Sequence, residues 1–183
     1  MKKPAHVLEI FLQPGEFYFG DENTRIRTLL GSCVAITLWH PQRRIGGMCH
    51  FMLPTRVGQS AEALDGRYAD EAIQLFQREI RSQRTAVRDY QVKLFGGGHM
   101  FQVPPRCADQ MRCSNVACRN VLAARALLKD QRLHVAAEHV GQRGHRNVIF
   151  DVWSGDVWLR HVKNPALRKQ SEHDESGSCL HRR

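Results

Sequence analysis

Residues 33–52 read CVAITLWHPQRRIGGMCHFM, and this stretch predicts a β-hairpin that decides the fold. Apolar positions alternate through 33–39, which is the period-two pattern of a half-buried strand, and residues 44–52 supply the return strand. Pro41 has a fixed φ and no backbone N–H, so it suits a turn better than the interior of a paired strand. The turn is therefore expected to centre near Pro41 and Gln42.

A turn at that point pairs Leu38 with Ile45, Val34 with Cys49 and Cys33 with His50. Directly opposed residues have Cβ atoms about 4.5–5.5 Å apart, which brings a thiol and an imidazole within reach of each other. A change of one residue in the turn would send side chains to the other face of the sheet. One face is expected to form core, and it carries Val34, Ile36, Leu38, Ile45, Cys49 and Phe51.

Cys33 and His50 on the remaining face form a candidate catalytic pair. An imidazolium beside a cysteine favours the nucleophilic thiolate and can later protonate a leaving group. Gly31 and Ser32 precede Cys33, and backbone N–H groups in such a tight approach can stabilise an oxyanion. The alternative is that Cys33 is a small buried apolar side chain and His50 a hydrogen-bonded strand histidine.

Further elements follow from periodicity and turn signals. Apolar positions recur at helical spacing in 69–80, and a second helix begins after a cap at Ser114 or Asn115 and ends near 131. Strands are expected at 7–12, 16–20, 91–95 and 133–140, and a hairpin at 147–162 with its turn at 154–156. The pattern predicts an α+β fold: a layered, sandwich-like β core, mixed or antiparallel, flanked by two main helices. One domain is expected over residues 1–163, with a disordered, basic and polar tail over 164–183.

Composition and charge limit the cellular location and the binding partners to be expected. The chain has 42% hydrophobic residues and a formal charge of +9. It has neither an apolar run of about 18–20 residues nor a signal-peptide pattern, so we expect a cytoplasmic protein without membrane insertion. An arginine cluster at Arg78, Arg81, Arg84 and Arg88 suits an acidic partner, although a merely solvated face explains it equally well. Because no nucleic-acid recognition motif accompanies the charge, nucleic-acid binding is not expected.

The six cysteines are expected to be reduced thiols, because nothing indicates secretion. The spacing of Cys107, Cys113 and Cys118 is not the usual spacing of zinc ligands. We therefore expect these cysteines to have no metal-binding role. Residues 96–98 are three consecutive glycines without the sequence of a phosphate-binding loop, which favours close backbone packing beside the pocket. No cofactor or metal is predicted.

Several segments together resemble the CheD family of chemoreceptor glutamine deamidases over residues 8–163. These segments are TLLGSCVA (28–35), GGMCHFMLP (46–54), KLFGGGHMF (93–101), RNV (119–121) and GQRGHR (141–146). The resemblance implies that Cys33 is the nucleophile, that His50 is its partner and that Thr28 is a third site residue. In the family, the spacing between this threonine and the cysteine varies by a residue. The third motif differs from the usual pattern, with Gly98-His99 in place of Ala-Ser, and the role of His99 is open.

The resemblance also implies the reaction and the partners. It implies that specific glutamines of methyl-accepting chemoreceptors are converted to glutamate through a cysteine thioester, with release of ammonia. It also implies possible methylesterase activity on receptor methyl-glutamates as a side activity. Chemoreceptor cytoplasmic domains are then the substrates, and a CheC-type phosphatase is a further partner. The alternative is a non-catalytic chemotaxis adaptor that docks to such a phosphatase or to a receptor.

Overall fold

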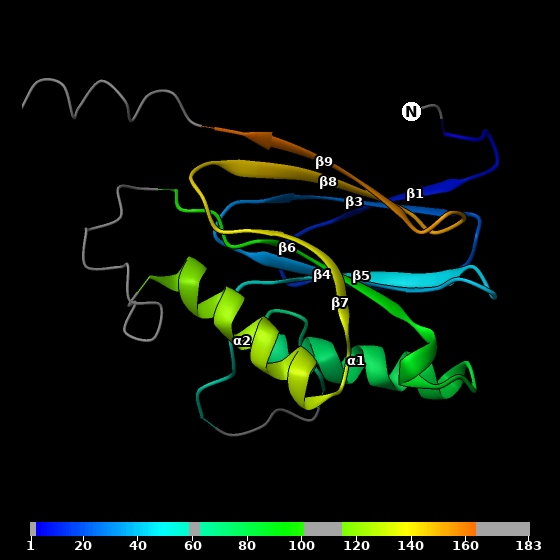
Figure 1. Cartoon of the computed structure of the whole chain (residues 1–183), viewed down its shortest axis with the longest axis horizontal. Coiled ribbons are helices and arrows are strands. Elements are labelled where there is room, and N and C mark those ends of the chain that lie inside the picture. Colours follow the sequence, from blue (N-terminus) through cyan, green and yellow to red (C-terminus); the bar gives the residue numbers. More distant parts are fainter. Residues whose placement is uncertain (1–2, 59–62, 101–114, 164–183) are drawn as a thin grey trace, which may run out of the picture.

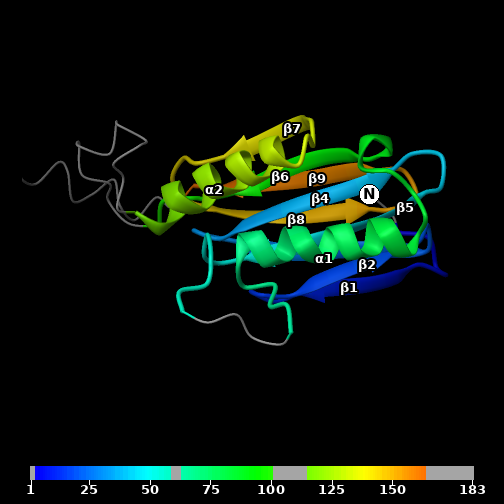
Figure 2. The same cartoon turned by 90° about the horizontal axis from the view of Figure 1, so that it is seen from below.

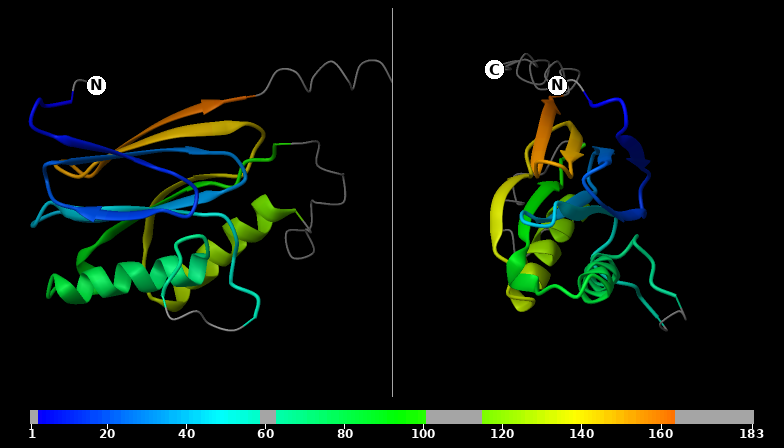
Figure 3. Two further views of the ribbon diagram at one scale, coloured as in Figure 1. Left: turned by 180° about the vertical axis from the view of Figure 1, so that it is seen from behind. Right: turned by 90° about the vertical axis from the view of Figure 1, so that its right-hand side faces the viewer.

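Two stacked β-sheets and two helices make up the computed structural model of the chain, which describes residues 3–58, 63–100 and 115–163. Both helices lie against the outer face of one sheet, and no helix covers the other sheet in the described ranges (Figure 1). The two further directions in Figure 2 and Figure 3 show the same layering. The elements are β1 (Leu8–Leu12), β2 (Phe17–Gly20), β3 (Thr24–Leu30), β4 (Val34–His40), β5 (Ile45–Phe51), α1 (Ala69–Ser82), the 3₁₀ helix η1 (Val87–Asp89), β6 (Gln91–Gly96), α2 (Val116–Asp130), β7 (Val135–Val140), β8 (His145–Asp151) and β9 (Asp156–Val162).

Both sheets are mixed. The first has the strand order β1-β3-β8-β9, with β1 and β3 parallel and the other pairs antiparallel. The second has the order β2-β5-β4-β6-β7, in which only β6 and β7 run parallel. The chain passes from the first sheet to the second in the short turn 31–33 between β3 and β4. The predicted α+β class with a layered, sandwich-like β core and two flanking helices is confirmed.

The second sheet has a hydrophobic core on each face. Its outer face packs against the helices, where the predicted apolar stripe of α1, including Ala72, Phe76 and Ile80, is buried. Its inner face packs against the first sheet through Ala35, Met48 and Phe95. The side of the hairpin opposite the helices therefore faces a second core layer and not solvent.

The register of the β4–β5 hairpin differs from the prediction. Residues 41–44 form the turn, which Arg44 closes with a φ of 50° and a hydrogen bond from its N–H to the His40 carbonyl at 2.9 Å. The turn is thus centred one residue later than expected, and Ala35, not Cys33, pairs with His50. The partner of each residue shifts by two positions, which preserves the faces, so Cys33 and His50 remain on the same side of the sheet.

Strand β3 was not predicted. Its inward residues Ile26, Thr28 and Leu30 alternate with Arg25 and Arg27, and the two arginines obscure the apolar pattern. Arg25 is nevertheless buried, because its Nε and Nη2 donate to the Asp151 carboxylate of β8 at 2.6 and 2.9 Å.

Other expectations fall on parts of the chain outside the described residues. These are the disordered tail over 164–183, the cap at Ser114, and Cys107 and Cys113 of the alternative zinc site. In the described ranges, no helix is both long and apolar enough to cross a membrane.

Candidate active site

The turn that carries Cys33 is held by the glycine triplet after β6. The N–H of Gly97 donates to the Cys33 carbonyl at 2.7 Å, and that of Gly98 donates to the Gly31 carbonyl at 2.8 Å. A Cβ atom at Gly96 would lie 2.3 Å from the Cys33 carbonyl oxygen, so a larger residue would displace the turn. The expectation of close backbone packing is confirmed, and it leaves the Cys33 thiol partly exposed and free of disulfide bonding.

His50 lies near the end of β5 with only 1% of its surface exposed. The β1–β2 connection fixes its backbone: its N–H donates to the Glu16 carbonyl at 3.0 Å, and its carbonyl accepts from the Gly15 N–H at 2.7 Å. The side chain points between the two sheets, on the same side of β5 as Met48. The imidazole is therefore held rigidly in an interior position.

Thr28 reaches the His50 ring from the opposite sheet. Its Oγ1 lies 2.7 Å from His50 Nδ1 and donates to the Leu12 carbonyl at 2.9 Å. A hydroxyl has one proton, and the Leu12 carbonyl can only accept, so Oγ1 must accept from an Nδ1–H. The neutral ring then carries its proton on Nδ1, and Nε2 keeps a free lone pair. In the described part of the chain, this buried Nε2 has no hydrogen-bond partner.

Cys33 and His50 are neighbours without being bonded to each other. Since Ala35 pairs with His50, Cys33 occupies the diagonal position, at which Cα atoms are typically about 7–8 Å apart. The absence of a partner for Nε2 means that the thiol makes no hydrogen bond to it in this state. The structure thus brings all three predicted residues to one end of the sandwich, with Thr28 and His50 in contact and Cys33 beside them.

The electrostatics favour a neutral thiol and a neutral imidazole. Burial lowers the pKa of His50 to about 4, against the smaller opposing effects of the Leu12 carbonyl and Glu16. Burial raises the pKa of the Cys33 thiol, while its own backbone N–H and the Ser32 hydroxyl act in the opposite direction. These two shifts favour a neutral thiol beside a neutral imidazole over the thiolate–imidazolium pair considered from sequence. A neutral imidazole with a free Nε2 has the lone pair that a general base requires.

His99 belongs to a neighbouring cavity. Its Nε2 lies 4.0 Å from Cys118 Sγ, and the two residues line a cavity of about 170 Å³ with Gly97 and Arg125. Burial lowers the pKa of His99, and Arg143 and Arg146 add to the effect. Gly97 lines this cavity, and its N–H contacts the Cys33 turn.

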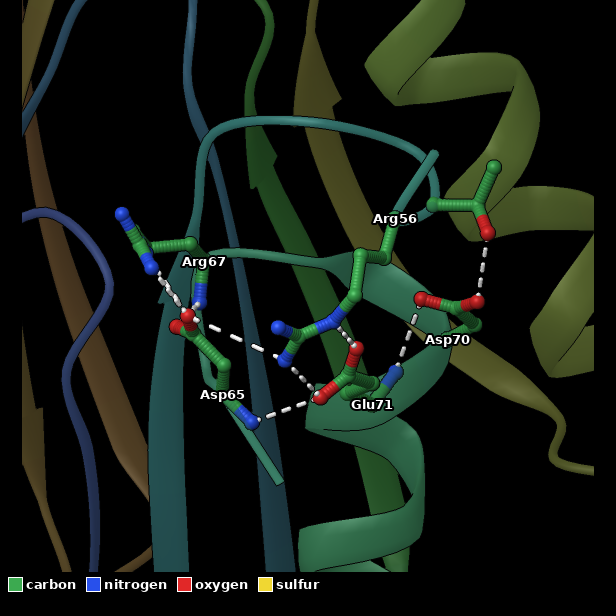
Figure 4. A network of polar contacts seen from close by, with 6 residues as sticks. Arg56, Asp65, Arg67, Asp70 and Glu71 are labelled. Carbon is green, nitrogen blue, oxygen red and sulfur yellow. Dashed lines mark hydrogen bonds and ion pairs between the residues drawn. The ribbon is translucent and has the colours of Figure 1, made fainter. Parts of the chain in front are cut away.

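The segment that follows β5 is tied to the start of α1 by charged contacts (Figure 4). Arg56 donates through Nε and Nη2 to the Glu71 carboxylate at 2.7 and 2.8 Å, and the Asp65 N–H donates to the same carboxylate at 2.7 Å. The Thr55 hydroxyl donates to Asp70 at 2.7 Å. This network ties Thr55 and Arg56, a few positions after His50, to the first turn of α1.

The arginine cluster lies at the far end of α1. Arg78, Arg81, Arg84 and Arg88 are all exposed. The Arg43 guanidinium, in the β4–β5 turn, donates to the Gln83 carbonyl at 2.6 Å, so α1 ends beside that turn. Because Cys33 and His50 lie at the other end of the hairpin, the cluster is not part of their site.

No group of three or more His, Cys, Asp or Glu side chains in the described ranges is arranged to bind a metal ion. Two contributors to the site were not identified from sequence: the Leu12 carbonyl, which fixes the Thr28 hydroxyl, and Asn120 of α2, which contacts both sides of the site. The RNV segment was the only signal for Asn120, and nothing local indicated Leu12.

Comparison with known proteins gives consistent matches. The family described as "CheD chemotactic sensory transduction" matches residues 52–161, more than half of the chain. "Probable chemoreceptor glutamine deamidase CheD" of Pseudomonas savastanoi pv. phaseolicola is 52% identical over 94% of this chain and 95% of its own length. The protein of the same name in Pseudomonas fluorescens is 53% identical over 93% of this chain and 94% of its own.

Two further matches were found. "Probable chemoreceptor glutamine deamidase CheD 3" of Dechloromonas aromatica is 51% identical over 85% of this chain and 89% of its own. A solved structure, the Bacillus licheniformis hypothetical protein YfiH, aligns with a TM-score of 0.42 and 14% identity over 67% of this chain and 49% of its own. The family match and the curated relatives, which extend across the Thr28, Cys33 and His50 region, show that the chain belongs to the CheD family.

Proposed function

We propose that the chain is a protein-glutamine deamidase that converts glutamine side chains of methyl-accepting chemoreceptors to glutamate. The relatives' names support the substrate and the reaction. The observation that carries the proposal is the imidazole of His50: its Nδ1–H is held by Thr28 and its free Nε2 lies on the face shared with Cys33.

The reaction begins with activation of the thiol. As substrate enters, the Cys33 thiol closes on His50 and transfers its proton to Nε2, and Sγ attacks the side-chain carbonyl carbon of glutamine. The Nδ1–H bond to Thr28 keeps the ring oriented while it becomes an imidazolium. Backbone N–H groups of the turn Gly31–Cys33 stabilise the oxyanion that forms on the amide oxygen.

The tetrahedral intermediate collapses when Nε2–H protonates the amide nitrogen, which leaves as ammonia, and a thioester remains on Cys33. Nε2 then takes a proton from water, the resulting hydroxide attacks the thioester carbonyl, and the Cys33 thiolate leaves and regains that proton. The sum is glutamine plus water to glutamate plus ammonia. By the same route, with methanol in place of ammonia, the proposed site would hydrolyse a receptor methyl ester, which is the methylesterase side activity that the resemblance implies.

The arginine cluster has a separate role in this proposal. It lies at the end of α1 remote from Cys33, so it contacts an acidic receptor surface away from the glutamine that reacts. Long-range attraction of this kind raises the rate of encounter and weakens as salt is added.

The test is incubation of the purified protein with a receptor cytoplasmic fragment, followed by mass spectrometry and ammonia detection. We expect the mass gain of a carboxamide-to-carboxylate conversion with wild type and none with Cys33→Ala. Cys49→Ala is the matched control, because Cys49 lies on the opposite face of β5, in the core beneath the helices. A wild type that releases no ammonia, or a Cys33→Ala variant as active as wild type, would refute the proposal.

The same experiment separates the enzyme from an adaptor. A chain that captures a CheC-type phosphatase or a receptor fragment equally well with and without Cys33→Ala, and releases no ammonia, would be a docking protein. Steep loss of that capture with added salt would show that electrostatic attraction mediates it.

A further inference from the structure

Asn120 of α2 links the two segments that carry the candidate catalytic pair. Its Nδ2 donates to the Met52 carbonyl at 2.7 Å and to the Ser32 carbonyl at 3.2 Å. Ser32 immediately precedes Cys33, and Met52 follows His50 by two residues. A single side-chain amide thus joins the nucleophile turn to the end of the strand that bears the base.

The orientation of this amide is determined by its surroundings. Both neighbours are carbonyl oxygens, which only accept, so the NH₂ group of Asn120 must face them. The residue has no exposed surface, and in the described part of the chain its Oδ1 has no hydrogen-bond partner. Burial of an unsatisfied acceptor is unfavourable, and an apolar residue would avoid it on this helix face. The two donated bonds are what distinguish asparagine from an apolar residue here.

The bond to Ser32 also sets the direction of the next N–H group. In a trans peptide the C=O and N–H bonds point in opposite directions, and the structure has no cis peptide among its described residues. Because the Ser32 carbonyl is directed at α2, the N–H of Cys33 is directed away from the helix. That N–H is one of the groups that lower the pKa of the Cys33 thiol, against the larger effect of burial. The Gly97 bond to the Cys33 carbonyl fixes the following peptide as well.

We propose that Asn120 is a positioning residue of the deamidase: it holds the Ser32–Cys33 peptide so that the Cys33 N–H faces the amide oxygen on which the oxyanion forms, and it sets the separation of the nucleophile turn from β5. This inference rests on the proposed function. Asn120 touches neither substrate nor thiol and acts through the two backbone carbonyls. Its contribution is therefore expected in turnover and not in substrate binding.

The test uses two substitutions and a control. Asn120→Asp has the same size, but a carboxyl group has at most one O–H to donate, so it cannot keep both bonds. Asn120→Ser is neutral and retains one donor, so its effect on Cys33 is free of an added charge. Asn115→Ala is the control: the Asn115 side chain caps α2 by accepting from the Ala117 N–H at 2.8 Å, and its loss weakens the same helix without touching Ser32 or Met52.

The first measurement is steady-state deamidation of the receptor fragment. Removal of an oxyanion donor typically lowers kcat about 100- to 1000-fold, and we expect Asn120→Asp to approach the lower value with KM changed less than about threefold. The kcat of Asn120→Ser should lie between those of Asn120→Asp and wild type. Asn115→Ala should keep the kcat of wild type.

The second measurement needs no turnover. The rate of Cys33 alkylation by iodoacetamide is followed against pH, with the peptide identified by mass spectrometry. Both Asn120 variants should move the midpoint to higher pH, since the thiolate loses an oriented N–H, while Asn115→Ala should leave it unchanged. If wild type has no deamidase activity, the proposed function fails, and the alkylation profiles still decide whether Asn120 positions the Cys33 N–H.

Three results would overturn the inference. The first is that both Asn120 variants keep the kcat and the alkylation midpoint of wild type. The second is that Asn115→Ala changes kcat and the alkylation midpoint as much as the Asn120 variants do. The third is loss of folding in both Asn120 variants, measured by urea unfolding, which would assign the residue to stability alone.

Discussion

Acidification should destabilise this protein through His50, and the size of the effect follows from its burial. The ring is 1% exposed, and its pKa in the folded protein is lowered from 6.5 to about 4. Below pH 6.5 the unfolded chain binds a proton that the folded chain excludes. The stability due to neutral His50 is therefore complete above pH 6.5 and is lost as the pH falls toward 4.

One pKa unit corresponds to about 1.36 kcal/mol, so at pH 5 the loss attributable to His50 is about 2 kcal/mol. The assay is urea unfolding of wild type and His50→Gln at pH 7.5 and pH 5. Burial also lowers the pKa values of His99 and His139, and their contribution is common to both proteins. The difference between the two pH dependences therefore isolates His50.

Parallel pH dependences in the two proteins would refute the neutral buried imidazole. The opposite sign is equally informative: if wild type gained stability relative to His50→Gln on acidification, the folded-state pKa of His50 would be raised, as in an ion pair with the Cys33 thiolate. A titration of the His50 ring by NMR gives the same answer directly. The experiment thus decides whether His50 starts the reaction as a base or as an imidazolium.

Substitutions at three positions test other parts of the structure. Thr28→Val removes the hydroxyl that orients the imidazole, and deamidation of the receptor fragment should show a kcat about 100-fold lower with KM little changed, while Thr28→Ser keeps most of the activity. Asp151→Asn leaves the buried Arg25 guanidinium without its counter-charge and should cost about 3–5 kcal/mol in urea unfolding; a loss under about 1 kcal/mol would contradict the buried pair. Gly98→Ala places a Cβ atom 2.3 Å from the Gly144 carbonyl, so the triplet must move and the Cys33 alkylation rate should change; an unaltered rate would show that the triplet does not hold the turn.

Much of the fold was predictable because its signals are local. Helix α1 shows an apolar stripe at helical spacing, and α2 begins at Asn115, whose side chain caps it as expected. The central strands carry runs of apolar residues bounded by turns. Strand β3 was missed because Arg25 is buried by a carboxylate 126 residues later, and no local pattern reveals such a partner.

The hairpin register shows where local reasoning ends. Pro41 correctly indicates the turn, but the turn extends to Arg44, a non-glycine residue in the left-handed region. Arginine gives no sequence signal for a positive φ, unlike the glycine or asparagine that usually mark one. Cys33 and His50 were nevertheless correctly predicted to share one side of the sheet. The pairing of β4 with β5 is shifted by two residues, and an even shift keeps each side chain on the same face.

The contact that defines the chemistry of His50 lies between the sheets. Thr28 belongs to β3 in one sheet and His50 to β5 in the other, and Cys33 lies on the turn that carries the chain between them. The Oγ1–Nδ1 distance of 2.7 Å therefore depends on how closely the sheets pack, and it is set by the interlayer core that contains Met48 and Phe95. A core substitution that widens this layer should impair the proposed turnover by freeing the imidazole, even if both candidate catalytic side chains and the hairpin are intact.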